Sequence, residues 1–197
     1  MGNPNWIEKL RESLDDVADP GVREEVLAGS EAVADMDEQS KAAWVKQALD
    51  KLDRRVDDED KRYDIMARCS CECAASIIPR FREVYRESGD IDALLEAMYK
   101  NPFYVRPRRE GNVIYFTKVA HNAEEHRKAT TEQEKRYFYC HCDWIRCTRE
   151  RITPTHCYCS AGWYRNIFEG VFERPVKVRL LKSVMQGDDT CEFAVYL

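Results

Sequence analysis

Cysteine is the residue type in this chain that could do chemistry. The 197 residues include nine cysteines, none before residue 69, and most of them stand in closely spaced groups. The amino terminus lacks the apolar stretch of an export signal, so we expect a cytoplasmic protein in a reducing environment. Clustered thiols in such a compartment indicate metal or redox chemistry more often than a disulfide framework.

Paired cysteines on separate elements can form a metal site, because two pairs supply the four ligands of a tetrahedral zinc ion. The candidate ligands are Cys69, Cys73, Cys140, Cys142, Cys157 and Cys159, with His156 and Cys191 as additional candidates. Zinc is the first choice, and an iron–sulfur cluster is the second. The spacing differs from that of zinc fingers. Small buried hydrophobes or a reactive thiol therefore stay open as alternatives.

The elements that carry these thiols follow from local patterns. A helical pattern through residues 69–85 would place Cys69 and Cys73 on one face, four residues apart. Residues 136–142 resemble a strand, which would place Cys140 and Cys142 on one side and His141 on the other. Cys157 and Cys159 open a helical segment, where the helix dipole favours a thiolate.

The remaining periodicity predicts an α+β fold. Helical stripes occupy residues 6–17, 45–56 and 91–98, and alternation of apolar residues predicts a strand over 113–117. Two further alternating runs, 176–180 and 191–197, flank a turn and predict a terminal hairpin. We therefore expect amino-terminal helices, then an antiparallel sheet with packed helices and a carboxy-terminal hairpin.

Charge divides the chain at about residue 66. Residues 1–66 carry 10 basic and 18 acidic side chains, a net charge of −8, whereas residues 67–197 carry 21 and 18, a net of +3. We predict an acidic helical extension over 1–66 and a cysteine-rich ligand- and metal-binding domain over 67–197. The overall charge of −5 argues against nucleic acid as a partner. The longest uncharged run, 152–164, is too short to span a membrane.

The carboxy-terminal half resembles a known family. The resemblance rests on three segments, Cys157-Tyr158-Cys159-Ser160-Ala161-Gly162-Trp163, Pro175-Val176-Lys177-Val178 and Gly187-Asp188-Asp189-Thr190-Cys191-Glu192-Phe193. They are similar to the vinyl-reductase-type small-molecule-binding domain and to aminothiazoline carboxylate hydrolase-like proteins, over roughly residues 65–197. The resemblance implies an antiparallel sheet packed against helices around a ligand cavity, with zinc bound through cysteines in some relatives. The resemblance also favours Cys191 as a metal ligand or as a residue that lines the site.

These observations leave three classes of function. The first is a metal-containing protein that binds or senses a small molecule, with Phe138 and Trp163 lining the ligand cavity. The alternative is a hydrolase acting on a small sulfur-containing or heterocyclic substrate, in which a metal would activate water or a cysteine would attack. The third is a partner-binding protein with a structural zinc. The sequence leaves turnover and a homodimer open.

Overall fold

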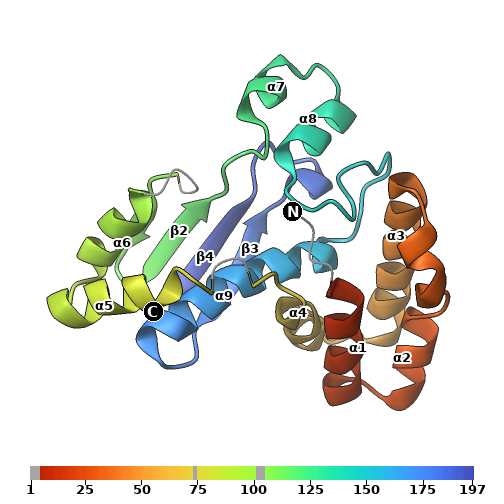
Figure 1. Ribbon diagram of the computed structural model, residues 1–197, viewed down its shortest axis with the longest axis horizontal. Coiled ribbons are helices and arrows are strands. Elements are labelled where there is room, and N and C mark those ends of the chain that lie inside the picture. Colours follow the sequence, from red (N-terminus) through yellow and green to blue (C-terminus); the bar gives the residue numbers. More distant parts are fainter. Residues whose placement is uncertain (1–4, 73–74, 101–104) are drawn as a thin grey trace.

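The structure is a computed structural model that describes residues 5–72, 75–100 and 105–197. It confirms the predicted α+β class, with helices at the amino terminus and a strand hairpin at the carboxy terminus (Figure 1). The first helices are α1 (Trp6–Val17), α2 (Pro20–Val26), α3 (Glu38–Arg55), α4 (Glu59–Arg68), α5 (Ile78–Ser88) and α6 (Ile91–Tyr99), with a 3-10 segment η1 (Ser30–Asp35). The later helices are α7 (Ala123–Lys128), α8 (Glu132–Tyr139) and α9 (Tyr158–Phe172), with 3-10 segments η2 (Pro154–Cys157) and η3 (Val184–Gln186).

Acidic residues begin several of these helices, as the sequence suggests. The Asp58 carboxylate accepts hydrogen bonds from the backbone N–H groups of Asp60 and Lys61 at the start of α4. Asp90 caps α6 in the same way, directly after Gly89 has ended α5 in the left-handed conformation. Such caps satisfy N–H groups that have no partner within the helix.

The sheet has the order β1-β2-β4-β3, and every neighbouring pair is antiparallel. Its strands are β1 (Arg108–Glu110), β2 (Val113–Thr117), β3 (Lys177–Lys182) and β4 (Glu192–Tyr196). Strand β2 and the hairpin of β3 and β4 confirm the prediction, whereas β1 is not predicted. The pairing of Thr117 with Glu192 brings the end of β2 beside the start of β4.

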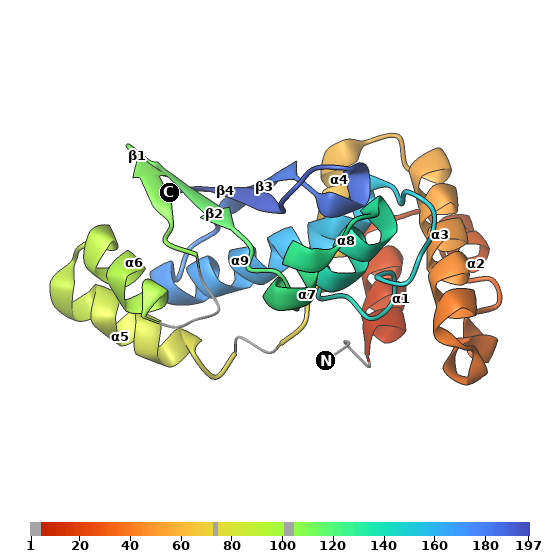
Figure 2. The ribbon, with the colours of Figure 1, turned by 90° about the horizontal axis from the view of Figure 1, so that it is seen from above.

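Helix α9 lies against one face of the sheet. Figure 2 shows it beneath the strands, with α5 and α6 at one end of the molecule and α1 to α3 at the other. Phe116, Tyr164 and Phe193 join the two layers, with ring centroids 5.0 Å apart for Phe116 and Tyr164 and 4.9 Å apart for Tyr164 and Phe193. The sequence thus buries aromatic side chains from both layers in one core.

Helices α4 and α9 cross at close range because α9 has a glycine at the contact. A Cβ atom on Gly162 would lie 2.0 Å from the Ala67 carbonyl oxygen. This contact fixes the amino-terminal end of α9 against α4. The predicted division at residues 66 and 67 falls inside α4, and buried side chains from both sides of it share one core cluster.

The helix predicted through residues 69–85 is wrong in its first part. Helix α4 ends at Arg68, Cys69 follows it, and α5 begins only at Ile78. Contacts to Ser70 draw the chain away from the helix, because Lys9 donates to its carbonyl at 2.9 Å and Asn166 to its hydroxyl at 2.8 Å. Cys73 lies outside the described residues, so its predicted pairing with Cys69 has no structural description.

No helix of the described ranges is both long enough and apolar enough to cross a lipid bilayer.

Candidate metal centre

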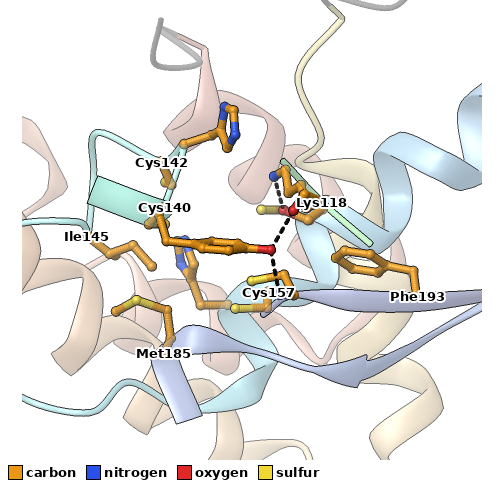
Figure 3. Close-up of a pocket in the computed structure, with 13 residues that line it drawn as sticks. Lys118, Cys140, Cys142, Ile145, Cys157, Met185 and Phe193 are labelled. Carbon is orange, nitrogen blue, oxygen red and sulfur yellow. Dashed lines mark hydrogen bonds between the residues drawn. The ribbon is translucent and has the colours of Figure 1, made fainter. Parts of the chain in front are cut away.

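A small cavity lies at the end of the sheet where β2 stops and β4 begins. Its volume is about 30 Å³, which is room for an ion or a water molecule. Its walls come from the segments around Lys118, α8 and the loop after it, the start of α9, η3 and β4 (Figure 3). The lining residues are Lys118, Tyr139, Cys140, His141, Cys142, Ile145, His156, Cys157, Cys159, Ser160, Met185, Cys191 and Phe193.

Cys140 and Cys142 both reach this cavity, but not from a strand. The predicted strand over 136–142 is wrong, because Thr131 and Glu134 form a capping box that begins helix α8. The helix ends at Tyr139, and the Cys140 N–H still donates to the Arg136 carbonyl at 2.9 Å. Both thiols therefore come from the loop that follows a helix.

His141 lines the same cavity as its two cysteine neighbours, which corrects the expectation that it faces away from them. In a loop, the strict alternation of side chains in a strand no longer applies. Its Nε2 lies 2.7 Å from the Val119 carbonyl oxygen. Burial, together with the nearby Lys118 charge, lowers the pKa of His141 to about 4.

Cys157 and Cys159 stand at the beginning of α9, where the sequence places them. Pro154 opens η2, and the Thr153 hydroxyl accepts a hydrogen bond from the Thr155 N–H, so the chain enters the helix through a capped 3-10 turn. Cys157 is buried, and its sulfur lies 3.1 Å from the Ser183 hydroxyl.

Cys191 is held between the sheet and α8. Its N–H donates to the Tyr139 hydroxyl oxygen at 3.1 Å, and its carbonyl accepts from the Lys118 N–H at 2.9 Å. The Tyr139 hydroxyl in turn donates to the Lys118 carbonyl. These bonds tie the ends of β2, β4 and α8 together around the cavity.

His156 is the most unusual residue of the site. Its side chain is 1% exposed, and neither ring nitrogen has a hydrogen-bond partner among the described residues. Burial lowers the pKa of His156 to about 4, with a smaller contribution from the Lys118 charge, so the ring is neutral at physiological pH. A neutral imidazole with two unpartnered buried nitrogens is costly to fold and offers a free donor to a metal.

Burial favours the protonated form of the thiols around His156. Burial raises the pKa of Cys140 and of Cys159 to about 11. Burial also raises the pKa of Cys142, helped by the neighbouring Cys140 and Cys159 thiols, and that of Cys157, helped by Cys191. These five thiols lie close enough to affect each other's ionisation, as the members of one ligand set must.

Three other predicted residues lie elsewhere. The Cys69 thiol is buried and donates to the Ile65 carbonyl at 3.3 Å, and Cys69 does not line the cavity. Phe138 lines a second depression of about 530 Å³ on the surface, together with Tyr137, Glu38 and Cys147. Trp163 lines neither of these two cavities.

The candidate donor atoms line one cavity, but they are not arranged around a single position for an ion. Within the part of the chain that the structure describes, no three Cys, His, Asp or Glu side chains stand in an arrangement that would hold a single ion. No disulfide joins any two of the eight described cysteines. The chemistry of the lining nevertheless fits a thiophilic metal, since five thiols and an unpartnered imidazole share its walls.

Sequence reasoning missed several lining residues, above all Lys118 and Ser160. Ser160 lies directly after Cys159 in the sequence, so the cysteines predicted as ligands could have indicated that it lies near the cavity. Lys118 follows a predicted strand, and no pattern in the sequence distinguishes it from a solvated lysine.

Comparisons with known proteins add one finding. A family model described as a family of unknown function, DUF6144, matches residues 115–197. The matched segment contains every residue that lines the 30 Å³ cavity, and it excludes Cys69. No curated protein and no solved structure matched the chain. The resemblance to vinyl-reductase-type domains stays a prediction.

Proposed function

We propose that this protein binds a thiophilic metal ion, zinc in the first place, in the cysteine-lined cavity. The observation that carries the proposal is His156, whose two buried nitrogens have no hydrogen-bond partner in the part of the chain that the structure describes. The imidazole shares the cavity wall with five thiols. Native proteins rarely leave such groups unpaired unless a ligand uses them. A metal would supply the missing partner.

The ligand set on this proposal comes from Cys140, Cys142, Cys157, Cys159, Cys191 and His156. A cysteine sulfur is one rotatable bond from the backbone, so thiols that already line one space converge by rotation about χ1. Binding also removes the thiol protons, because the thiolate is the metal ligand. Cys69 is no longer a candidate on this proposal, since it lies outside the cavity.

The size of the cavity favours a single ion. A volume of about 30 Å³ is far below that of sites for organic ligands, which is of the order of 300–1,000 Å³. An iron–sulfur cluster, the second choice, also needs more room than one ion. The small-molecule part of the prediction has its support in the surface depression beside Phe138, whose volume of about 530 Å³ falls in the usual range.

Binding without turnover suits this site better than hydrolysis. Several thiolates donate charge to a zinc ion and reduce its ability to activate water, and a hydrolytic site keeps one position open to substrate. The buried walls leave little space for a substrate beside the ion. We therefore favour a closed centre over the hydrolase alternative.

Metal content of matched variants tests the proposal. In reducing buffer, the wild type should hold about one equivalent of zinc after reconstitution, and the double variant Cys140→Ser, Cys142→Ser should lose it. Cys147→Ser is the control, because its thiol donates to the Glu38 carbonyl and does not line the cavity. A wild type that retains no metal after dialysis, or a double variant that keeps it, contradicts the proposal. A brown protein with visible absorbance would instead indicate iron–sulfur.

A further inference from the structure

Lys118 places a positive charge in the wall of the proposed metal centre. It is the only charged side chain among the thirteen lining residues. Its Nζ donates to the Ser160 hydroxyl at 3.2 Å, and no carboxylate of the described ranges forms an ion pair with it. Figure 3 shows Lys118 across the cavity from Cys140 and Cys142. A half-buried ammonium is thus left without a countercharge.

The backbone on both sides of this lysine is held in place. The Lys118 N–H donates to the Cys191 carbonyl at 2.9 Å, and the Lys118 carbonyl accepts from the Tyr139 hydroxyl. Both partners line the cavity themselves. The lysine is therefore fixed to the same framework that carries the candidate ligands.

The Lys118 side chain shares the cavity walls with candidate donors from two segments. Cys140 and Cys142 come from the loop after α8, and Cys157 and Cys159 from the start of α9. An ammonium in this position repels a bare dication among neutral donors and attracts a centre that carries net negative charge.

We propose that Lys118 is the countercharge of the metal–thiolate centre and that it selects an anionic ligand set. A divalent ion with three thiolates and His156 carries a net charge of −1, and one with four thiolates carries −2. Three or four thiols each lose a proton to solvent when the ion enters. The lysine then gains the ionic partner that it lacks in the metal-free protein. This inference rests on the proposed function.

A purely structural role for Lys118 predicts a different outcome. If the lysine only linked the end of β2 to α9 through Ser160, its loss would destabilise the metal-free fold. If it acts as a countercharge, its loss removes an uncompensated charge from that fold and harms only the metal-bound state. Stability and metal affinity should then change in different directions.

Two substitutions separate charge from hydrogen bonding. Lys118→Met removes both, whereas Lys118→Gln removes the charge and retains a donor for Ser160. Lys118→Arg keeps the charge. Lys177→Met is the matched control, because Lys177 is an exposed lysine at the start of β3 and does not line the cavity.

The measurement is zinc affinity by competition with a chromophoric chelator, together with the melting temperature in excess chelator. We expect Lys118→Met and Lys118→Gln to bind zinc at least about tenfold more weakly than the wild type, since a unit countercharge acts at short range. Lys118→Arg should stay within a few fold and Lys177→Met should match the wild type. Neither neutral variant should melt earlier than the wild type in chelator.

Each other result overturns the inference. Wild-type affinity in both neutral variants would show that the charge is irrelevant, while leaving the metal site itself intact. Earlier melting of Lys118→Met and Lys118→Gln in chelator would assign the lysine a structural role. A wild type that binds no zinc would overturn the proposed function and this inference with it.

Discussion

Replacing His156 with leucine should have opposite effects on the metal-free and the metal-bound protein. The ring is 1% exposed and neither nitrogen forms a hydrogen bond with another described residue, so its two polar atoms cost free energy in the metal-free fold. Leucine is of similar size and has no polar atoms to satisfy. An unpartnered buried donor or acceptor costs about 1–3 kcal/mol. We expect His156→Leu to raise the free energy of unfolding by about 1–2 kcal/mol in chelator, allowing for imperfect repacking.

The pKa of His156 gives a second signature of the same residue. Its value of about 4 in the fold, against 6.5 for the free side chain, favours the neutral ring in the native state. The metal-free wild type should therefore be at full stability above pH 6.5 and lose stability as the pH falls toward 4. The full difference is worth about 3 kcal/mol at about 1.4 kcal/mol per pKa unit. His156→Leu should lack this part of the acid destabilisation.

Urea unfolding at several pH values, with chelator and with zinc, measures both effects. Trp6 supplies an intrinsic fluorescent probe, because its ring centroid lies 6.0 Å from that of His156. Zinc should stabilise the wild type strongly and the variant much less. A variant that is less stable than the wild type in chelator would show that the ring has a partner in the metal-free fold. Equal stabilisation of both by zinc would remove His156 from the ligand set.

Two further predictions concern the thiols and the helix contact that positions them. Burial raises the pKa of Cys140 and Cys159 to about 11, so the folded state favours the protonated thiols. The metal-free protein should therefore be fully stable below about pH 9 and lose about 2–3 kcal/mol of unfolding free energy per thiol as the pH rises to 11. A urea midpoint that does not change between pH 8 and 10.5 would contradict this. Gly162→Ala should destabilise the protein by about 2 kcal/mol or more, since the new Cβ would lie 2.0 Å from the Ala67 carbonyl oxygen. Gly21→Ala is its control, as the nearest atom is 4.0 Å away, and equal melting temperatures for the two variants would refute the close contact.

Local signals predicted most of the fold and failed where two of them competed. The helical stripes over residues 6–17 and 91–98, and the alternation in β2 and β4, all appear in the structure. Residues 137–139 are aromatic and favour a strand, yet the capping box eight residues upstream of Tyr139 starts a helix there. A helix start depends on a few specific side chains, so it can override a weak average propensity.

The sequence indicated most of the candidate donor residues of the site, but not the other residues that line the cavity. Spacing indicated six cysteines, and the structure brings four of them, Cys140, Cys142, Cys157 and Cys159, to one cavity. Cys140 and Cys142 lie on a different element from the one predicted, Cys69 lies outside the cavity, and Cys73 lies outside the described residues. Lys118 could not be found in this way. Its place in the cavity follows from the pairing of β2 with β4, which is a long-range contact that no local pattern encodes.

The coordination shell of the zinc-loaded protein tests the central claim most directly. X-ray absorption at the zinc edge should show three or four sulfur atoms at about 2.3 Å, with a nitrogen at about 2.0–2.1 Å if His156 binds. His156→Leu should lose the nitrogen and keep the sulfur. A shell of oxygen and nitrogen alone, or one sulfur with bound water, would contradict a buried thiolate centre in this cavity.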